Sequence, residues 1–273
     1  MTIDELNIYS TGLSTLFGVP EINMGEAGSK VTIQVPGLSA IELIVPDSCK
    51  ENTKLFAHHI WKASILMSRI LVGEHLSLEY CNQLQSMSVL ELGAASGLPS
   101  IVCLAKGAEQ VTSSDYPDPN IIDALKRNIA KNVERSLTRS TVVGHCWNNP
   151  ETLCCIQRSS PSPDGRFDLV LLADTFWMPE QHDNLLTDLQ RLVDPMGRVL
   201  AVAGLHTGRA VMEAFFSKAE CYGFLVERLA IVKIPIGSGS GHDLDWQLIA
   251  DECIPDDVEE RKRFLFVYEM WFE

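Results

Sequence analysis

One segment constrains the fold more than any other, because an apolar strand leads through a glycine-bearing turn directly into a helix. The strand is predicted over residues 88–92 and the helix over residues 98–105. Gly93 and Gly97 lie in the turn, where the lack of a Cβ lets the backbone approach a ligand closely. Because ligands of open α/β sheets bind at the carboxyl ends of the strands, a binding site is expected at this turn.

Strand and helix patterns alternate through most of the chain. Strands are predicted at residues 88–92, 110–114, 141–146, 167–173, 198–203, 225–234 and 264–272. Helices are predicted at residues 55–71, 98–105, 181–192 and 209–221, and another starts at Asp118-Pro119 with one apolar face. This alternation predicts an α/β fold with a Rossmann-like, mostly parallel sheet and helices on both faces. No helix separates the last two strands, so the last strand is expected to run antiparallel.

The first part of the chain follows a different pattern. Residues 31–35 and 41–45 are two extended segments separated by Pro36-Gly37, which predicts a β-hairpin. Residues 1–29 are expected to form a loosely held arm. We therefore divide the chain into an N-terminal arm with a β-hairpin extension, residues 1–54, and the α/β domain, residues 55–273. Polar loops are expected at residues 158–165 and 237–241.

Charge and cysteine content exclude several classes of protein. Lys and Arg total 22 against 36 Asp and Glu, and the net charge of −14 disfavours nucleic-acid binding. No apolar run approaches the roughly 18 residues that a membrane span needs, and the first basic residue is Lys30, which disfavours a secretory signal. The eight cysteines form no CxxC pair, which predicts reduced core residues and no metal site. We expect a soluble protein of the cytoplasm or the nucleus.

The turn and the strand that follows it indicate a nucleoside cofactor. Asp115 ends the next predicted strand, where a carboxylate can accept both hydroxyls of an adenosine ribose. A dinucleotide site would need G-x-G-x-x-G facing pyrophosphate, but here Glu91 precedes the first glycine by two residues. An acid at that position suits a cationic ligand and repels phosphate, so a nicotinamide-dinucleotide oxidoreductase ranks last. A tight turn that binds nothing is the alternative.

Several separated motifs carry a family resemblance. They are His58–Trp61 (HHIW), Val89–Ile101 (VLELGAASGLPSI), Ser114–Pro119 (SDYPDP), Trp147-Asn148, Leu171–Trp177 (LLADTFW), Gln181–Leu185 (QHDNL) and Arg263–Glu269 (RFLFVYE). With them the chain resembles the class I, seven-strand methyltransferases that use S-adenosyl-L-methionine. The nearest group is the lysine methyltransferase branch, which includes fungal nicotinamide N-methyltransferase-like proteins and enzymes that modify the N-terminus and lysines of an elongation factor. The resemblance implies a seven-strand sheet and S-adenosylmethionine as cofactor.

The resemblance also implies roles for individual residues. Trp61 would close over the methionine end, Asp115 would hold the ribose and Trp147 would flank the adenine. The whole predicted cofactor-binding set is Trp61, Glu91, Gly93, Ala94, Ala95, Gly97, Asp115, Tyr116, Trp147 and Ala173. A tryptophan can stack on adenine or face a sulfonium cation, whereas the same residue seen in isolation would more often pack in a core. Ala95 replaces the middle glycine of the family's loop, a mild change.

Asp174 and Trp177 are the predicted catalytic residues, at the end of the fourth strand of the α/β domain. Related enzymes usually carry tyrosine where Trp177 stands, so a tyrosine-dependent proton step is in doubt here, although an aromatic wall against a methylammonium group remains. Asp174 either accepts a hydrogen bond from a substrate amine or caps the following helix. His58, His59 and His206 also fall near the predicted site, and core or surface histidines are the favoured interpretation of all three.

Three functions remain open at this stage. The first is N-methylation of a protein amine, a lysine or an N-terminus, in a basic segment that the acidic surface would attract. The acidic residues of Asp243–Glu260 could contribute to that attraction or form a solvated linker. The second is a small-molecule methyltransferase, for a secondary metabolite or a nicotinamide-like acceptor. The third is a non-catalytic or repurposed protein with the same fold. The oligomeric state is not predicted.

Overall fold

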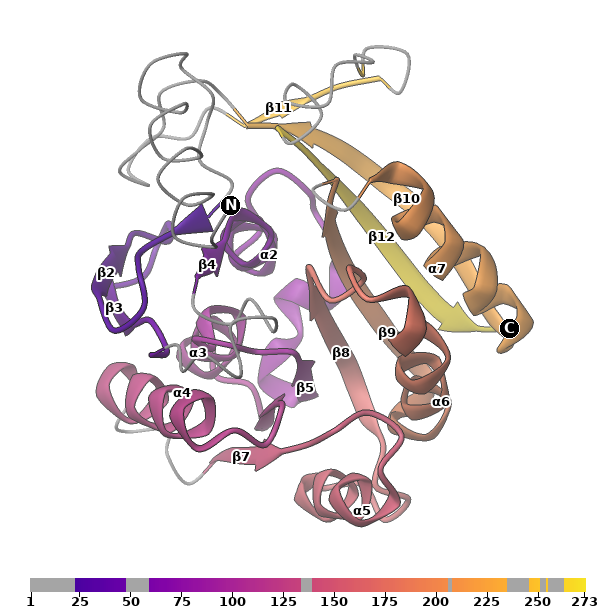
Figure 1. Ribbon diagram of the computed structural model, residues 1–273, viewed down its shortest axis with the longest axis horizontal. Coiled ribbons are helices and arrows are strands. Elements are labelled where there is room, and N and C mark those ends of the chain that lie inside the picture. Colours follow the sequence, from indigo (N-terminus) through magenta and orange to yellow (C-terminus); the bar gives the residue numbers. More distant parts are fainter. Residues whose placement is uncertain are drawn as a thin grey trace, which may run out of the picture.

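The predicted strands of the α/β domain pair into one central sheet in the computed structural model, which describes residues 23–47, 59–133, 139–205, 208–234, 246–250, 254 and 263–273. The strand order is β11-β10-β12-β9-β8-β5-β6-β7. The strands are β5 (Ser88–Leu92), β6 (Gln110–Asp115), β7 (Ser140–Gly144), β8 (Phe167–Ala173), β9 (Val193–Gly204), β10 (Phe224–Lys233), β11 (Gln247–Leu248) and β12 (Phe264–Phe272). Figure 1 shows this sheet running through the middle of the molecule.

Strand directions confirm a mostly parallel sheet with an antiparallel last strand. β7, β6, β5, β8 and β9 run parallel to one another, whereas β12 lies between β9 and β10 and is antiparallel to both. The sheet has an eighth strand beyond the seven predicted, because β11 pairs antiparallel with the end of β10 through Val232 and Leu248. A strand of two residues leaves no readable period in the sequence.

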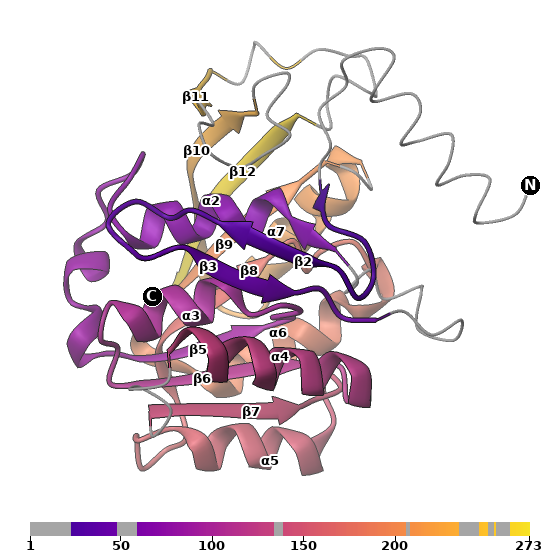
Figure 2. The ribbon, with the colours of Figure 1, turned by 90° about the vertical axis from the view of Figure 1, so that its left-hand side faces the viewer.

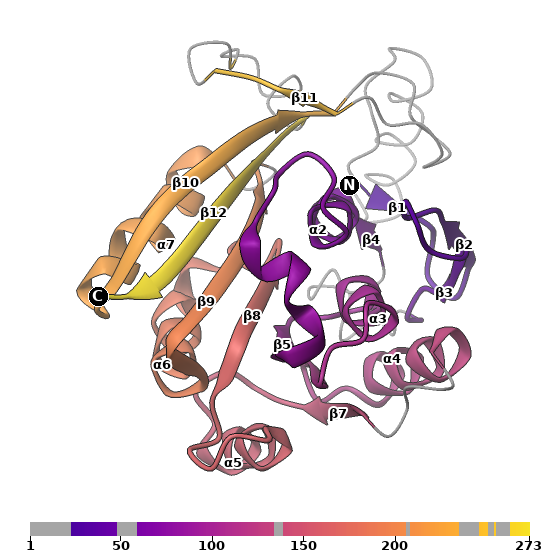
Figure 3. The ribbon, with the colours of Figure 1, turned by 180° about the vertical axis from the view of Figure 1, so that it is seen from behind.

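Helices cover both faces of the sheet, as predicted. They are α2 (Lys62–Leu71), α3 (Leu98–Ala105), α4 (Pro119–Asn132), α5 (Pro150–Ser159), α6 (His182–Leu192) and α7 (Arg209–Cys221). One core cluster joins the sheet to α2, α3 and α4, and a second joins the other face to α5, α6 and α7. Figure 3 shows the same two layers from behind. The site described below therefore lies on a sheet that is packed on both faces.

The predicted hairpin is present and is held by α4. β2 (Lys30–Ile33) pairs antiparallel with β3 (Ile41–Ile44), and Figure 2 shows the pair beside α3 and α4. The buried Asn128 side chain accepts from the Ile44 amide at 2.7 Å and donates to the Ile44 carbonyl at 2.9 Å. It also donates to the Ser96 carbonyl at 3.0 Å, so one amide side chain joins the hairpin to the glycine-bearing turn. The proposed boundary at residue 54 lies outside the described residues.

The helix predicted over residues 55–71 begins later than expected. Ile60 and Trp61 form strand β4, which pairs with β1 (Asn23–Met24), and α2 starts at Lys62. Trp61 is the N-cap residue and is extended, with φ −78° and ψ 144°. The pairing with a segment almost forty residues earlier keeps this backbone out of the helix, and the apolar spacing alone does not reveal it. Residues 48–58 lie outside the described part of the chain.

Helix α5 was not predicted, and it takes in the first residues of the polar loop expected at 158–165. Asn149 caps the helix, since its side chain accepts from the backbone amides of Glu151 and Thr152, and Pro150 is the first helical residue. An Asn-Pro pair is a readable start signal for a helix. The loop expected at residues 237–241 and most of the acidic segment at 243–260 lie outside the described residues.

Two further expectations concern the membrane and the cysteines. Within the ranges that the structure describes, no helix combines the length and the apolar character that crossing a membrane requires. Cys81 and Cys103 are buried as predicted, but Cys146, Cys155 and Cys221 are exposed and Cys154 is half-buried. The expectation of core positions was therefore wrong for these four, because their helices and loops turn them outward. All six of these thiols are free.

Candidate active site

The predicted site residues gather at the carboxyl ends of β5, β6 and β8. A main cavity of about 170 Å³ is lined by nine of them: Trp61, Gly93, Ala95, Asp115, Tyr116, Trp147, Ala173, Asp174 and Trp177. A minor cavity of about 20 Å³ shares four of these residues and adds the remaining three predicted ones, Glu91, Ala94 and Gly97. The structure thus brings all twelve predicted residues together, at the sheet edge where α/β folds bind ligands.

Gly93 and Gly97 shape the turn that separates β5 from α3. Both have positive φ, at 72° and 78°. A Cβ on Gly93 would lie 2.6 Å from the Thr175 Cγ2 atom, and one on Gly97 would lie 2.5 Å from the Leu125 Cδ1 atom. Ala95 also has positive φ, at 46°, so it occupies a conformation that glycine adopts more easily. The turn therefore depends on these glycines for close packing against the segment after β8 and against α4.

Asp115 ends β6 and closes the turn from the opposite side. Its two carboxylate oxygens accept hydrogen bonds from the amides of Ala95 and Tyr116, each at 2.7 Å. Burial raises the pKa of Asp115 to about 6 despite these two hydrogen bonds. Each carboxylate oxygen keeps a further lone pair, so the group can still accept from a pair of neighbouring hydroxyls. The Asp115 carboxylate is thus still able to accept further hydrogen bonds, as the predicted ribose contact would require.

Glu91 lies deeper than its predicted role suggested. It is fully buried, and its carboxylate accepts from both the amide and the hydroxyl of Ser100 in the first turn of α3. Burial raises the pKa of Glu91 to about 8, so the carboxyl is largely protonated at neutral pH. A cationic ligand group in the minor cavity would lower that pKa again. The residue both supports the helix start and lines the cavity.

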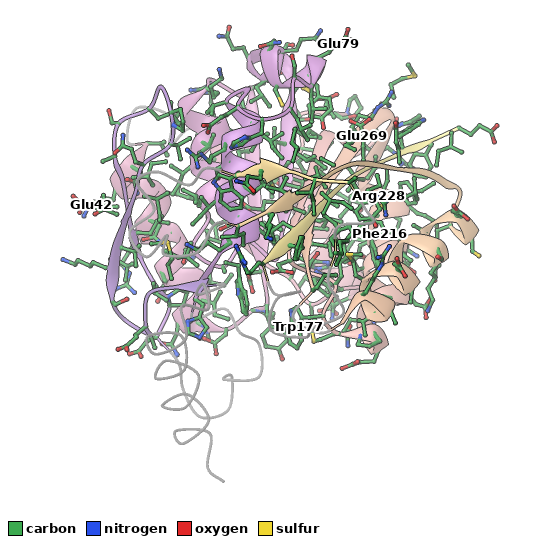
Figure 4. The ribbon with its side chains drawn as sticks, turned by 90° about the horizontal axis from the view of Figure 1, so that it is seen from above. Glu42, Glu79, Trp177, Phe216, Arg228 and Glu269 are labelled. Atoms are coloured by element: carbon green, nitrogen blue, oxygen red, sulfur yellow. The ribbon has the colours of Figure 1, made fainter. Side chains whose placement is uncertain are left out.

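Aromatic side chains from four different segments form much of the main cavity. Trp61 precedes α2, Tyr116 follows β6, Trp147 follows β7 and Trp177 follows β8. His59 lies edge-on to Trp61, with ring centroids 6.0 Å apart, and its Nδ1 donates to the Gly25 carbonyl. Figure 4 shows Trp177 on the side of the molecule opposite Glu79. These faces suit a flat base at one end of the cavity and a cation at the other.

Asp174 lies where β8 leaves the sheet. Its φ is +60°, and its Oδ1 accepts from the Gly204 amide at 3.0 Å while its own amide donates to the Val202 carbonyl. Helix α6 begins at His182 with Gln181 as its N-cap residue, so Asp174 does not cap that helix. The capping alternative is therefore wrong. The carboxylate instead lines the cavity next to Trp177.

The residues of the site fit S-adenosylmethionine. The Ser96 and Thr175 hydroxyls are buried without a partner in the described structure, and they line the minor and the main cavity respectively. Buried hydroxyls are costly unless a ligand or water pairs with them. The described lining of the two cavities holds no Lys or Arg and three carboxyls, of which Glu91 becomes ionised more readily when a cation binds beside it, so the lining suits a sulfonium better than a pyrophosphate. Among the side chains that the structure describes, no group of three His, Cys, Asp or Glu residues is placed to hold a metal ion.

Sequence reasoning missed five residues that line the main cavity. They are His145, Cys146, Thr175, Met178 and Gln181. Each lies within four residues of a predicted site residue, so strand-end position was the available signal. Of the three histidines considered earlier, His59 lines the minor cavity, and His58 and His206 lie outside the described residues.

Comparisons with known proteins all identify methyltransferases as the relatives of this chain. The sequence profile of the family described as lysine methyltransferase matches residues 42–221. The chain is 31% identical over 185 residues to the protein N-terminal and lysine N-methyltransferase EFM7 of Candida glabrata, covering 66% of this chain and 68% of that protein. It is 28% identical over 237 residues to the protein of the same name from Gibberella zeae, covering 81% of this chain and 82% of that protein.

Solved structures support the fold. A methyltransferase complexed with SAH aligns with a TM-score of 0.54 and 12% identity, over 90% of this chain and 57% of that one. A SAM-dependent methyltransferase from Streptococcus mutans aligns with the same score and identity, over 90% of this chain and 56% of that one. At such low identity the likeness concerns the architecture alone.

Proposed function

Since this chain belongs to the lysine methyltransferase family and is an S-adenosylmethionine-dependent methyltransferase, we propose that it methylates protein amines, either a lysine side chain or an N-terminal amine. The similar proteins from Candida glabrata and Gibberella zeae carry both activities in their names. We propose further that the acceptor segment is basic and that the reaction takes place in the cytoplasm or the nucleus.

The observation that carries the proposal is the continuity of the main cavity. It runs from Asp115 and Trp147, which suit the nucleoside, to Asp174 and Trp177, which no cofactor role accounts for. The described residues that line the main cavity include two carboxyls, those of Asp115 and Asp174, and no Lys or Arg. Such a site attracts an ammonium group, and the net charge of −14 extends that preference to a basic segment around it.

Methyl transfer depends more on the positions of the reacting groups than on acid–base catalysis. Bound S-adenosylmethionine supplies a methyl carbon on a positively charged sulfur, to which an unprotonated amine nitrogen bonds as the carbon–sulfur bond breaks. Asp115 and the glycine-bearing turn fix the nucleoside end, which sets the direction of approach. The aromatic faces around the acceptor end limit the access of water to the reacting nitrogen.

Asp174 and Trp177 would act on the acceptor. The Asp174 carboxylate, held by the Gly204 amide, can accept a hydrogen bond from the amine and so aim its lone pair at the methyl carbon. The indole face of Trp177 can stabilise the positive charge that the nitrogen gains. Trp177 has no phenolic hydroxyl, so neither role requires a proton to pass through it.

The test is incorporation of label from methyl-labelled S-adenosylmethionine into proteins of a cell extract that lacks this enzyme. The wild-type protein should label a small number of protein bands, and mass spectrometry should place the methyl groups on lysine or N-terminal nitrogen. Asp174→Asn should lower the labelling about tenfold while still binding S-adenosylhomocysteine. Label confined to the low-molecular-weight fraction would overturn the protein-amine proposal and favour the small-molecule alternative.

A further inference from the structure

A fully buried carboxylate on α6 contacts the loop that carries Trp147. The Asp188 Oδ2 atom accepts from the His145 ring Nε2 and from the Asn148 backbone amide, each at 2.8 Å. The side chains of Asp188 and His145 have no exposed surface. In the sequence, Trp147 lies between His145 and Asn148, the two residues that Asp188 contacts. Figure 1 shows this loop running from β7 past α6 into α5.

His145 lines the main cavity but is not free to act on a substrate. Its second ring nitrogen, Nδ1, lies 2.7 Å from the Thr152 hydroxyl, so both nitrogens are engaged within the protein. Its backbone amide donates to the Asp115 carbonyl at 2.7 Å. His145 therefore connects Asp188 and α5, through its ring, to the end of β6, through its backbone amide. A general-base role does not suit a ring held at both nitrogens.

A second polar link joins the same loop to the acceptor side. Asn148 donates through its side-chain amide to Asn184 Oδ1 at 3.1 Å, and Asn184 donates to Gln181 Oε1 at 2.9 Å. Gln181 lines the main cavity. Asn148 has φ +62°, a conformation that needs support from its surroundings. The loop is thus held against α6 by Asp188 and by Asn184, and both of them contact that strained residue directly.

Stability alone is a poor explanation for Asp188. Its Oδ1 atom is buried and, in the described structure, has no hydrogen-bond partner. A buried carboxylate with one unpaired oxygen carries a large desolvation cost, which an apolar side chain at this position would avoid. The Asp188 carboxylate instead fixes the conformation of the loop, because one of its oxygens accepts hydrogen bonds from both the His145 ring and the Asn148 backbone amide.

We propose that Asp188 is a positioning residue for methyl transfer. It acts through His145 and Asn148 to hold Trp147 against the cofactor base, and it fixes the position of that loop relative to the acceptor side of the cavity. The inference rests on the proposed function for the acceptor and on S-adenosylmethionine as the cofactor. Asp188 touches neither ligand.

The test is calorimetric binding of S-adenosylhomocysteine to the full chain and to Asp188→Ala, which removes the acceptor for both hydrogen bonds, each with Trp147 intact and with Trp147→Ala. Asp188→Ala should weaken binding about tenfold when Trp147 is present and less than twofold when it is absent. This non-additivity is the readout, because a general loss of stability would lower affinity equally in both backgrounds. Asp183→Ala is the matched control, since Asp183 is exposed on the same helix and binds Lys218 and Tyr222 instead.

Thr152→Val provides a second, milder variant should Asp188→Ala fail to fold, because it removes only the hydroxyl that holds the His145 ring from the other side. It should weaken binding about threefold with Trp147 present and leave it unchanged with Trp147→Ala. Unchanged affinity, or equal losses in both backgrounds, would overturn the positioning role. Failure of the wild-type protein to bind at all would instead contradict the cofactor assignment, and binding without protein methylation would contradict only the proposed acceptor.

Discussion

The two sides of the main cavity are built from different parts of the chain. On the cofactor side the backbone does most of the holding: Ala94 donates to the Ser114 carbonyl, Ala95 donates to the Asp115 carboxylate, and Gly97 donates to the Ala94 carbonyl. On the acceptor side, half-exposed side chains of Trp177, Met178 and Gln181 project from a segment with a short 3-10 turn.

This difference explains why the cofactor is easier to infer than the acceptor. A turn that forms backbone hydrogen bonds at positive φ tolerates few residue types, so it leaves a motif in the sequence. Side chains on a connecting segment can change without disturbing the sheet. We therefore expect replacements on the cofactor side to change cofactor affinity or stability, and replacements on the acceptor side to change methyl transfer without changing cofactor affinity.

The largest effect is expected for Asp115→Ala on the cofactor side. Loss of the carboxylate removes the acceptor for the ribose hydroxyls and for two backbone amides, so the affinity for S-adenosylhomocysteine should fall about 100-fold, or about 3 kcal/mol. Calorimetry measures it directly. Asp123→Ala, an exposed change on α4, should bind like the wild-type protein. An Asp115→Ala variant that binds within threefold of wild type would contradict the assigned geometry.

Gly93→Ala should be the next most damaging change, and its effect should appear in stability. The new Cβ would meet Thr175 at 2.6 Å in a backbone with φ +72°, and we expect a loss of about 2 kcal/mol. Gly73→Ala is a matched control, because Gly73 has φ +87° but nothing within 4 Å of the added atom. Denaturant unfolding of both variants separates the steric contact from the backbone cost. Equal losses would show that the contact with Thr175 is unimportant.

Replacing Trp177 should leave the cofactor side intact. Trp177→Ala removes the aromatic wall beside Asp174, so methyl transfer to protein should fall about tenfold while affinity for S-adenosylhomocysteine stays within twofold. Trp177→Tyr should retain most of the activity, since a phenol also presents a π face. Label transfer and calorimetry on the same preparations make the comparison. A parallel loss of cofactor affinity would mean that the two sides are not separate.

The smallest effect is expected from pH. The ribose hydroxyls bind the ionised carboxylate of Asp115, whose pKa is raised to about 6 by burial. Affinity should therefore be present above that pKa and should decline as pH falls through it, by about fourfold between pH 7 and pH 5.5. Glu91, with a pKa raised to about 8, stays largely protonated across this window. Asp115→Asn should bind weakly with a flat profile, and a wild-type profile that is equally flat would contradict the role of the carboxylate.

Local patterns were sufficient for the seven longer strands of the sheet, for the hairpin and for the glycine-bearing turn. Helix α7 lies where its periodicity predicts it, at Arg209–Cys221, because its apolar face is read within one helix. Gly93 and Gly97 were found for a similar reason, because they lie in the turn between a predicted strand and a predicted helix. Asp115 was found because it ends the next predicted strand. These features depend on residues close together in the sequence, and so the sequence by itself determined them.

The tertiary structure decided what depends on distant partners. Trp61 is extended because its backbone pairs with Asn23, and Asp188 holds His145 although 43 residues separate them. Neither of these contacts produces a periodic pattern or a motif in the sequence. A hydrogen bond between two remote segments restricts one residue in each segment, and the number of residues between them is free to vary. The acceptor side of the site belongs to this second class, since it forms only when the segment after β8 folds back against the loop after β7.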